Sequence, residues 1–282
     1  MSEIILEARD LELRFGGVLA ANGASLSVRA NERIAIIGPN GAGKTTFINL
    51  CTGYLKPQSG RVIFAGQDVT GLSPRTITRR GIGRSFQIPQ LFTDNTVMEN
   101  LLLALSAREG TWSPFLRLDR HPKREEMVAL LDSVGLRDTA ERLVRELPEG
   151  MRKLIDIAVA LALDPKLIFM DEPTSGVSSS EKFQVMDTLT RALDARATTA
   201  IFVEHDMDVV ARYASRVAVW SGGRIALEGT PDEILNHPEV RETVIGVGVE
   251  PCWRSGDCRP SSRACRCCAR SISRWTRVQP WR

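Results

Sequence analysis

Alternating and continuous apolar runs in the first part of the chain predict β-strands. Residues 4–14 and 25–28 alternate between apolar and polar positions, as antiparallel strands with one covered face do. Residues 33–37 are almost entirely apolar, which indicates a short strand buried on both faces. Residues 60–66 form a further candidate strand bounded by glycines. The pattern therefore predicts antiparallel strands ahead of a buried one.

Helical periodicity dominates the middle of the chain. The predicted helices are residues 98–107, 125–134 and 152–163. They separate Gln87 from a second buried strand that ends at Asp171, and they predict a helical subdomain inserted over about residues 90–165. Residues 110–124 instead predict an irregular loop, whose apolar members could meet a partner: Trp112, Pro114, Phe115 and Pro122.

A phosphate-binding loop follows the buried strand at residues 33–37. It matches the pattern G-x-x-x-x-G-K-[ST] and precedes a predicted helix. The candidate nucleotide-binding residues are Gly38, Pro39, Asn40, Gly41, Ala42, Gly43, Lys44, Thr45 and Thr46. The glycines let successive N–H groups point at a polyphosphate, while Lys44 reaches the β- and γ-phosphates and the Thr45 hydroxyl binds Mg²⁺. A nucleoside triphosphate is the expected ligand.

Two carboxylates, Asp171 and Glu172, follow the second buried strand. The carboxyl end of such a strand is where open α/β sheets place their ligands. Asp171 can hold Mg²⁺, which leaves Glu172 to orient or deprotonate a water for attack on the γ-phosphate. Either carboxylate alone would also suit an acidic helix cap before Pro173. Their pairing downstream of a phosphate loop favours catalysis.

These residues resemble those of the ATP-binding cassette (ABC) ATPases that power membrane transporters. The resemblance runs from about Leu6 to about Glu250. It rests on the order of further family elements, which are Phe15, Ser85-Phe86-Gln87, Asp171-Glu172 and Glu204-His205-Asp206. Taken singly, Phe15 also fits a core, Gln87 a polar loop and His205 a local hydrogen bond.

The resemblance implies a role for each matching residue. Phe15 would stack on adenine, Gln87 would touch Mg²⁺ and the attacking water, and His205 would contact the γ-phosphate. The implied catalytic residues are Lys44, Gln87, Glu172 and His205. The implied metal ligands are Thr45, Gln87 and Asp171. ATP and Mg²⁺ are therefore the expected cofactors.

The family resemblance also implies an architecture and partners. The fold would be α/β, a P-loop NTPase with a RecA-like core, an N-terminal antiparallel β subdomain and an inserted helical subdomain, all within residues 1–250. The chain would pair with a second ABC ATPase, identical or not, and bind transmembrane permease subunits through the helical lobe, with the Gln87 loop as a hinge. A solute-binding protein would join indirectly, and no nucleic acid is expected.

The segment aligned with the family signature L-S-G-G-Q departs from it. Here it reads Leu147-Pro148-Glu149-Gly150-Met151. In the family this segment caps the ATP of the opposite subunit, so Gly150 is a predicted nucleotide contact in trans. Pro148 removes a hydroxyl and an N–H donor, which would weaken closure of the dimer about 10- to 100-fold. We expect it in the first turn of the helix at residues 152–163, and we expect Glu149 to point outward.

A second departure lies at Ser178, where many relatives carry an aspartate that couples the two sites of the dimer. Ser178 keeps a hydroxyl but no charge, and is a further predicted contact to the nucleotide. Together with Pro148 it raises the alternative of a cassette that binds ATP and hydrolyses it at its own phosphate loop but contributes a degenerate half-site to its partner. Pro148 also keeps open a regulatory module that holds ATP without productive hydrolysis. A clamp-like ABC ATPase acting on a soluble complex is another alternative, against which the single cassette argues.

Finer resemblance points to importers. Gly16-Gly17-Val18, Arg84-Ser85-Phe86-Gln87 and Glu204-His205-Asp206-Met207 look like the ATPases of branched-chain amino acid importers, and urea or amide importers have similar ones. The hydrophobic content of 43% allows a sizeable core, but no apolar run spans a membrane and no signal peptide begins at Met1. The expected location is the cytoplasmic face of the inner membrane.

Residues 251–282 differ abruptly in composition. They hold five of the six cysteines and eight arginines with Asp257 as the sole acid, so they carry +7 and leave −4 for the rest. Metal binding is open, although paired C-x-x-C units are absent, and so is a basic arm for lipid or nucleic acid. We favour a disordered, out-of-frame ending, which reading the gene in its other frames past Val249 would test.

Overall fold

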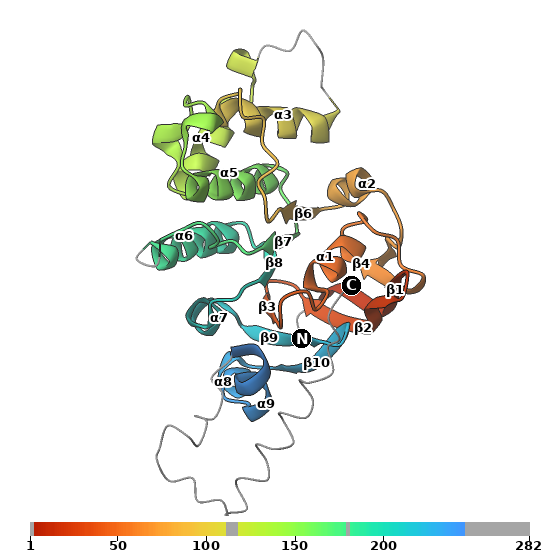
Figure 1. The fold of residues 1–282 in the computed structure, drawn as a ribbon. Coiled ribbons are helices and arrows are strands. Elements are labelled where there is room, and N and C mark those ends of the chain that lie inside the picture. The colour runs from red at the N-terminus through yellow and green to blue at the C-terminus, as the bar shows by residue number, and fades with distance from the viewer. Residues whose placement is uncertain (1–2, 111–117, 179–180, 246–282) are drawn as a thin grey trace, which may run out of the picture.

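The computed structural model describes residues 3–110, 118–178 and 181–245. Two sheets and a group of helices make up this part of the chain (Figure 1). The first sheet is antiparallel, with the order β2-β1-β4-β5. Its strands are β1 (Ile4–Phe15), β2 (Val18–Arg29), β4 (Ser59–Phe64) and β5 (Gln67–Asp68). The predicted N-terminal antiparallel subdomain is therefore present, and β2 is longer than the four residues that the alternation predicted.

The second sheet has the order β10-β9-β3-β8-β7-β6. Five of these strands run parallel, and β10 is antiparallel to β9 at one edge. The strands are β3 (Arg33–Ile37), β6 (Ile82–Ser85), β7 (Leu167–Asp171), β8 (Thr199–Val203), β9 (Arg216–Ser221) and β10 (Arg224–Gly229). Since β3, β8 and β7 are neighbours, the segments after their carboxyl ends meet at one edge of the sheet.

Alternate residues of the central strands enter two different cores. On β3, Ile34 and Ile36 pack with the antiparallel sheet and α1 (Lys44–Cys51), whereas Ala35 packs with the helices on the other face. Cys51, the last residue of α1, is fully buried in the first of these cores. Burial on both faces explains why these strands read as continuous apolar runs.

Helices α3 (Val97–Glu109), α4 (Arg124–Ser133) and α5 (Glu149–Ala162) lie between β6 and β7 in the chain. In Figure 1 they form a separate group above the sheets, beyond α6 (Lys182–Ala195). The predicted helices are confirmed, with bounds shifted by one to three residues. The other described helices are α2 (Pro74–Arg79), α7 (Met207–Tyr213), α8 (Pro231–Leu235) and α9 (Pro238–Val240).

The start of α5 corrects one expectation. Pro148 is the N-cap residue, with φ −62° and ψ 158°, and the helix begins at Glu149 rather than at residue 152. The Arg152 N–H donates to the Pro148 carbonyl at 3.1 Å, which closes this first turn. Glu149 is exposed, as expected. Glu149 and Gly150 at the start of α5 had hidden this turn from the apolar periodicity.

Short turns complete the described chain. Three are 3₁₀ turns and one is a π turn, at Leu118–Arg120, Arg137–Thr139, Val144–Glu146 and Arg241–Ile245. Trp112, Pro114 and Phe115 of the predicted loop lie outside the described residues, as does the 251–282 tail. Within the part of the chain that the structure describes, no helix combines the length and apolarity needed to cross a membrane.

Candidate functional site

The phosphate loop connects β3 to α1, and main-chain carbonyl groups of Trp220 and Ala20 lie close against it. A Cβ at Gly38 would lie 2.3 Å from the Trp220 carbonyl oxygen, and one at Gly43 would lie 2.6 Å from the Ala20 carbonyl oxygen. Gly43 also has φ 104°, a conformation that side chains disfavour. The Trp220 indole donates to the Ala42 carbonyl at 2.6 Å, so this buried tryptophan fixes the loop. No sequence pattern had pointed to Trp220.

Lys44 begins α1 and lies under the loop with only 6% of its surface exposed. Its ammonium donates to the Gly38 carbonyl at 2.7 Å and to the Pro39 carbonyl at 2.9 Å. Burial lowers the pKa of Lys44, while the charges of Glu172 and Asp171 act in the opposite direction. A buried cation next to a cradle of main-chain N–H groups suits a polyphosphate, which would supply the anionic partner.

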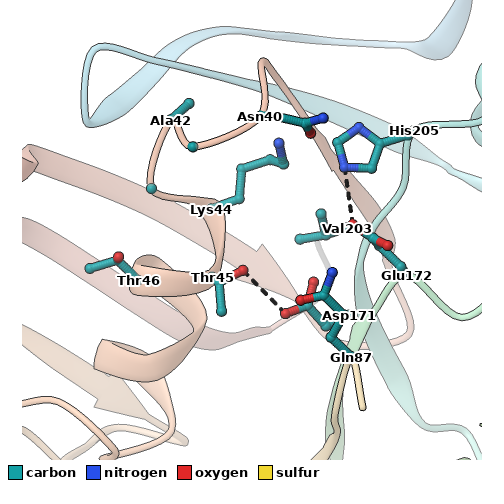
Figure 2. A pocket seen from close by; sticks show the side chains of 12 residues that line it. Asn40, Ala42, Lys44, Thr45, Thr46, Gln87, Asp171, Glu172, Val203 and His205 are labelled. Atoms are coloured by element: carbon teal, nitrogen blue, oxygen red, sulfur yellow. Dashed lines mark hydrogen bonds and ion pairs between the residues drawn. The ribbon is translucent and has the colours of Figure 1, made fainter. Parts of the chain in front are cut away.

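Thr45 and Asp171 bring two oxygen atoms together across the loop and the end of β7. The Thr45 hydroxyl donates to Asp171 Oδ2 at 3.3 Å, as the dashed line in Figure 2 marks. Asp171 is only 2% exposed, and this burial raises the pKa of its carboxyl. Hydroxyl and carboxylate oxygens are ligands that Mg²⁺ accepts, with phosphate and water completing its shell. The chemistry of the donor set therefore fits Mg²⁺.

Glu172 and His205 face each other from the ends of β7 and β8. His205 Nε2 lies 3.2 Å from Glu172 Oε1, and both side chains are partly exposed (Figure 2). Glu172 has φ 51°, in the left-handed region that few residues with side chains adopt. Such a conformation costs about 1–3 kcal/mol and persists where the surroundings impose it. Here the Glu172 N–H donates to the Val203 carbonyl at 3.0 Å.

Glu204 ties the segments that carry these two residues to each other. Its carboxylate is 3% exposed and accepts hydrogen bonds from the Thr174 N–H at 3.0 Å, the Thr174 hydroxyl at 2.8 Å and the His205 N–H at 3.2 Å. Burial raises the pKa of the Glu204 carboxyl, and these donors act against that effect. Glu204 was quoted in the sequence only as a neighbour of His205, so its role was missed.

A single cavity of about 630 Å³ collects most of the predicted site. Its lining consists of Asn40, Gly41, Ala42, Gly43, Lys44, Thr45, Thr46, Gln87, Asp171, Glu172, Val203 and His205. All of the residues predicted as catalytic or metal-binding are thus brought together (Figure 2). Gly38 and Pro39 do not line the cavity; their carbonyls accept hydrogen bonds from the Lys44 ammonium.

Besides Gly38 and Pro39, three further predicted nucleotide contacts do not line this cavity. Phe15 lies at the end of β1, half exposed. Gly150 lines a second cavity of about 310 Å³ together with Pro148 and Gly176. Ser178 is exposed and its hydroxyl donates to Glu181 at 2.5 Å. Their contacts with nucleotide stay predictions.

Comparison with known proteins identifies the class. The profile of the ABC transporter family matches residues 21–175, which is more than half of the chain. The chain therefore belongs to the ABC transporter family, and it is an ATPase of the P-loop α/β fold. The expected fold class and enzymatic activity are confirmed.

Curated relatives carry more specific names. The high-affinity branched-chain amino acid transport ATP-binding protein LivG of Salmonella typhimurium is 34% identical over 253 residues, covering 87% of this chain and 99% of the relative. A probable LivG of Methanocaldococcus jannaschii is 36% identical over 251 residues, covering 86% and 97%. The corresponding protein BraF of Pseudomonas aeruginosa is 32% identical over 253 residues, covering 87% and 99%. The resemblance to branched-chain amino acid transport ATPases is confirmed.

Solved structures agree. The ADP conformation of an ATP-binding cassette of an ABC transporter has a TM-score of 0.77 and 33% identity, covering 88% of this chain and all of the other. A nucleotide-free ATP-binding cassette has a TM-score of 0.76 at the same identity and coverage. The relatives named for transport give no support to the alternative of a regulatory module.

Proposed function

We propose that this chain is the ATP-hydrolysing subunit of an importer for branched-chain amino acids or a similar small polar solute. It works as one of two cassettes on the cytoplasmic face of the inner membrane, bound to permease subunits that receive solute from an extracytoplasmic binding protein. The names of the relatives support the substrate class, because those proteins are ATP-binding subunits for branched-chain amino acid transport.

The proposal of a dimer rests on the separation between the phosphate loop and the signature segment at residues 147–151. The phosphate loop, Asp171, Glu172 and His205 share one cavity, whereas Gly150 lines another. In this chain, Gly150 of the signature segment therefore does not line the cavity of its own phosphate loop. A second cassette in head-to-tail orientation supplies its own signature segment there, and Gly150 and Ser178 of this chain serve the partner's ATP.

The residues of the cavity divide the work of hydrolysis. Lys44 and the loop N–H groups bind the phosphates. Thr45, Asp171 and Gln87 would hold Mg²⁺, which would supply positive charge to the reacting phosphoryl group. Glu172 orients and deprotonates the attacking water, and His205 contacts the γ-phosphate. The 3.2 Å contact between His205 and Glu172 favours this division, since it places both at the same end of the cavity.

Exposed apolar side chains around the Gln87 loop favour a permease partner. Tyr54, Ile88 and Phe92 are exposed by 51%, 75% and 63%. Tyr54 also lines a groove of about 400 Å³ together with Pro74 of α2 and Ala104 of α3. Large exposed apolar side chains are typical of a protein–protein interface. A cytoplasmic helix of the permease docks in this groove and there senses the position of the Gln87 loop.

Reconstituted transport tests the proposal. The full chain is assembled in proteoliposomes with the permease, second ATPase and binding protein of the same transporter, and ATP-driven uptake of leucine, isoleucine, valine and urea is measured. Uptake of leucine, isoleucine and valine that disappears with Glu172→Gln is expected. Uptake of urea alone would show that the assigned substrate class is wrong. ATP hydrolysis that is unaffected by the permease would refute a role in import.

A further inference from the structure

Lys153 is a buried lysine of α5 whose ammonium binds three main-chain carbonyls. The side chain is 2% exposed. Its Nζ donates to the Phe86 carbonyl at 2.5 Å, the Gln87 carbonyl at 2.9 Å and the Asp171 carbonyl at 2.7 Å. A lysine ammonium has three N–H donors, so all of them are used. One side chain thus joins the Gln87 loop to the end of β7.

Asp156 follows Lys153 by one turn of the same helix and binds the same loop. It is 5% exposed. Its Oδ2 accepts a hydrogen bond from the Phe86 N–H at 2.8 Å, and its Oδ1 accepts one from the Gln90 N–H at 3.1 Å. Both ends of the segment that carries Gln87 are therefore attached to α5, while the side chain of Gln87 remains in the ATP-binding cavity.

Burying these two charges is costly, which sets them apart from ordinary helix residues. Burial lowers the pKa of Lys153 and raises the pKa of Asp156. Packing of α5 does not require them, because Ile155, Ile157 and Leu161 already bury its apolar face. Buried charges persist where hydrogen bonds satisfy them, and here every bond reaches the main chain of the site.

We propose that Lys153 and Asp156 are positioning residues for ATP hydrolysis, which hold Gln87 in place relative to Asp171. Neither residue lines the cavity of the phosphate loop. Lys153 contacts the main chain of both Gln87 and Asp171, two residues whose side chains line the same cavity. Asp156 prevents the loop from turning about the lysine, because it binds one N–H on each side of Gln87.

Hydrolysis kinetics of the full chain test this role. Lys153→Met keeps the length of the side chain but removes the donors, so kcat should fall about 10- to 100-fold, the cost of misplacing a catalytic group by about 1 Å. The KM for ATP should stay within about twofold, since the phosphate loop is untouched. Lys153→Arg keeps several donors and should recover most of kcat. Full kcat in Lys153→Met would overturn the proposal.

Amide hydrogen exchange without nucleotide gives a second readout. Lys153→Met and Asp156→Asn should both speed exchange in a peptide containing residues 86–90, because these amides lose their fixed surroundings. The side-chain amide in Asp156→Asn has one acceptor oxygen where the carboxylate offers two, so one of the two N–H bonds is lost. Unchanged exchange in both variants would refute the attachment.

Leu161→Ala is the matched control on the same helix. It removes apolar packing from α5 but none of the hydrogen bonds that Lys153 and Asp156 make to the Gln87 loop. At an equal loss of melting temperature, it should keep kcat within about twofold of the wild type and leave exchange in residues 86–90 unchanged. If Leu161→Ala lowers kcat as much as Lys153→Met does, the effect is one of stability and the proposal fails. If Lys153→Met does not fold, Asp156→Asn decides by the same two readouts.

Discussion

His205 Nε2 lies 3.2 Å from Glu172 Oε1, although the two residues follow different strands of the sheet. The contact leaves the other carboxylate oxygen of Glu172 available to a water. Glu172→Gln keeps the shape of the side chain and removes the base, so turnover should fall about 100-fold or more. Binding of ATP should persist, as equilibrium titration with a fluorescent ATP analogue would measure. Unchanged turnover would exclude Glu172 as the base.

Lys44→Ala should act on binding instead. The ammonium lies under the phosphate loop and is bonded to the carbonyls of Gly38 and Pro39. Hydrogen bonds to charged groups contribute about 1.5–3 kcal/mol, so the Kd for ATP should rise about 10- to 100-fold. Isothermal titration with Mg²⁺·ATP measures this, and Lys56→Ala, at an exposed lysine outside the cavity, is the control. Retained affinity in Lys44→Ala would contradict the assignment.

Glu204→Gln should lower kcat about tenfold with little change in KM, because it disturbs the position of His205 rather than the phosphate loop. The new amide would place an NH₂ group against either the Thr174 donors or the His205 N–H. Thr174→Ser keeps the hydroxyl that Glu204 accepts and serves as the control. Steady-state ATP hydrolysis compares Glu204→Gln with Thr174→Ser. Equal kcat in both variants would show that Glu204 does not position His205.

Tyr213 gives a pH-dependent contribution to stability that is independent of the site. Its hydroxyl has two acceptors within reach, Asp187 Oδ1 at 2.7 Å and the Phe183 carbonyl oxygen at 2.9 Å, and burial raises the pKa of Tyr213 to about 12 from 10.0. The unfolded chain therefore loses this proton first as the pH rises. Between about pH 9 and pH 11, the wild type should lose about 1.4 kcal/mol of its advantage over Tyr213→Phe. Urea unfolding at both pH values measures it, and a constant difference would refute the linkage.

Pro148→Ser tests the departure in the signature segment. As the N-cap of α5, Pro148 offers neither an N–H nor a hydroxyl to an opposing γ-phosphate. Restoring both should strengthen ATP-dependent dimerisation about 10- to 100-fold in the Glu172→Gln background. Light scattering with ATP measures the dimer, and Pro122→Ser, at an exposed turn, is the control. No gain would mean that the helix N-terminus and Gly150 suffice.

Much of the catalytic cavity could be predicted from local sequence patterns. The phosphate loop, Asp171 and Glu172 each stand directly after a buried apolar strand, and such strands are visible as continuous runs. Since parallel strands direct their carboxyl ends to one edge, the position of each group directly after its strand was enough to place them together. His205 needed the family resemblance, because a histidine after a strand has many local uses.

Lys153, Asp156 and Trp220 could not be found in this way. Their partners are main-chain groups far away in the sequence, which carry no side-chain signature. A lysine and an aspartate one turn apart on a helix also match the pattern of a solvent-facing surface. Likewise, the first seven residues of β2 escaped notice because alanines and Asn22-Gly23 obscure the alternation.

Cys51 has a practical consequence for experiments on this molecule. It is the one free thiol among the described residues; it is fully buried, and burial raises its pKa. The other five cysteines all lie beyond Glu250. A chain shortened at that point would offer maleimide reagents almost no background, since a protonated, inaccessible thiol reacts slowly. A cysteine introduced at exposed Ile88 could then carry a single spin label or fluorophore beside Gln87 and report its motion directly.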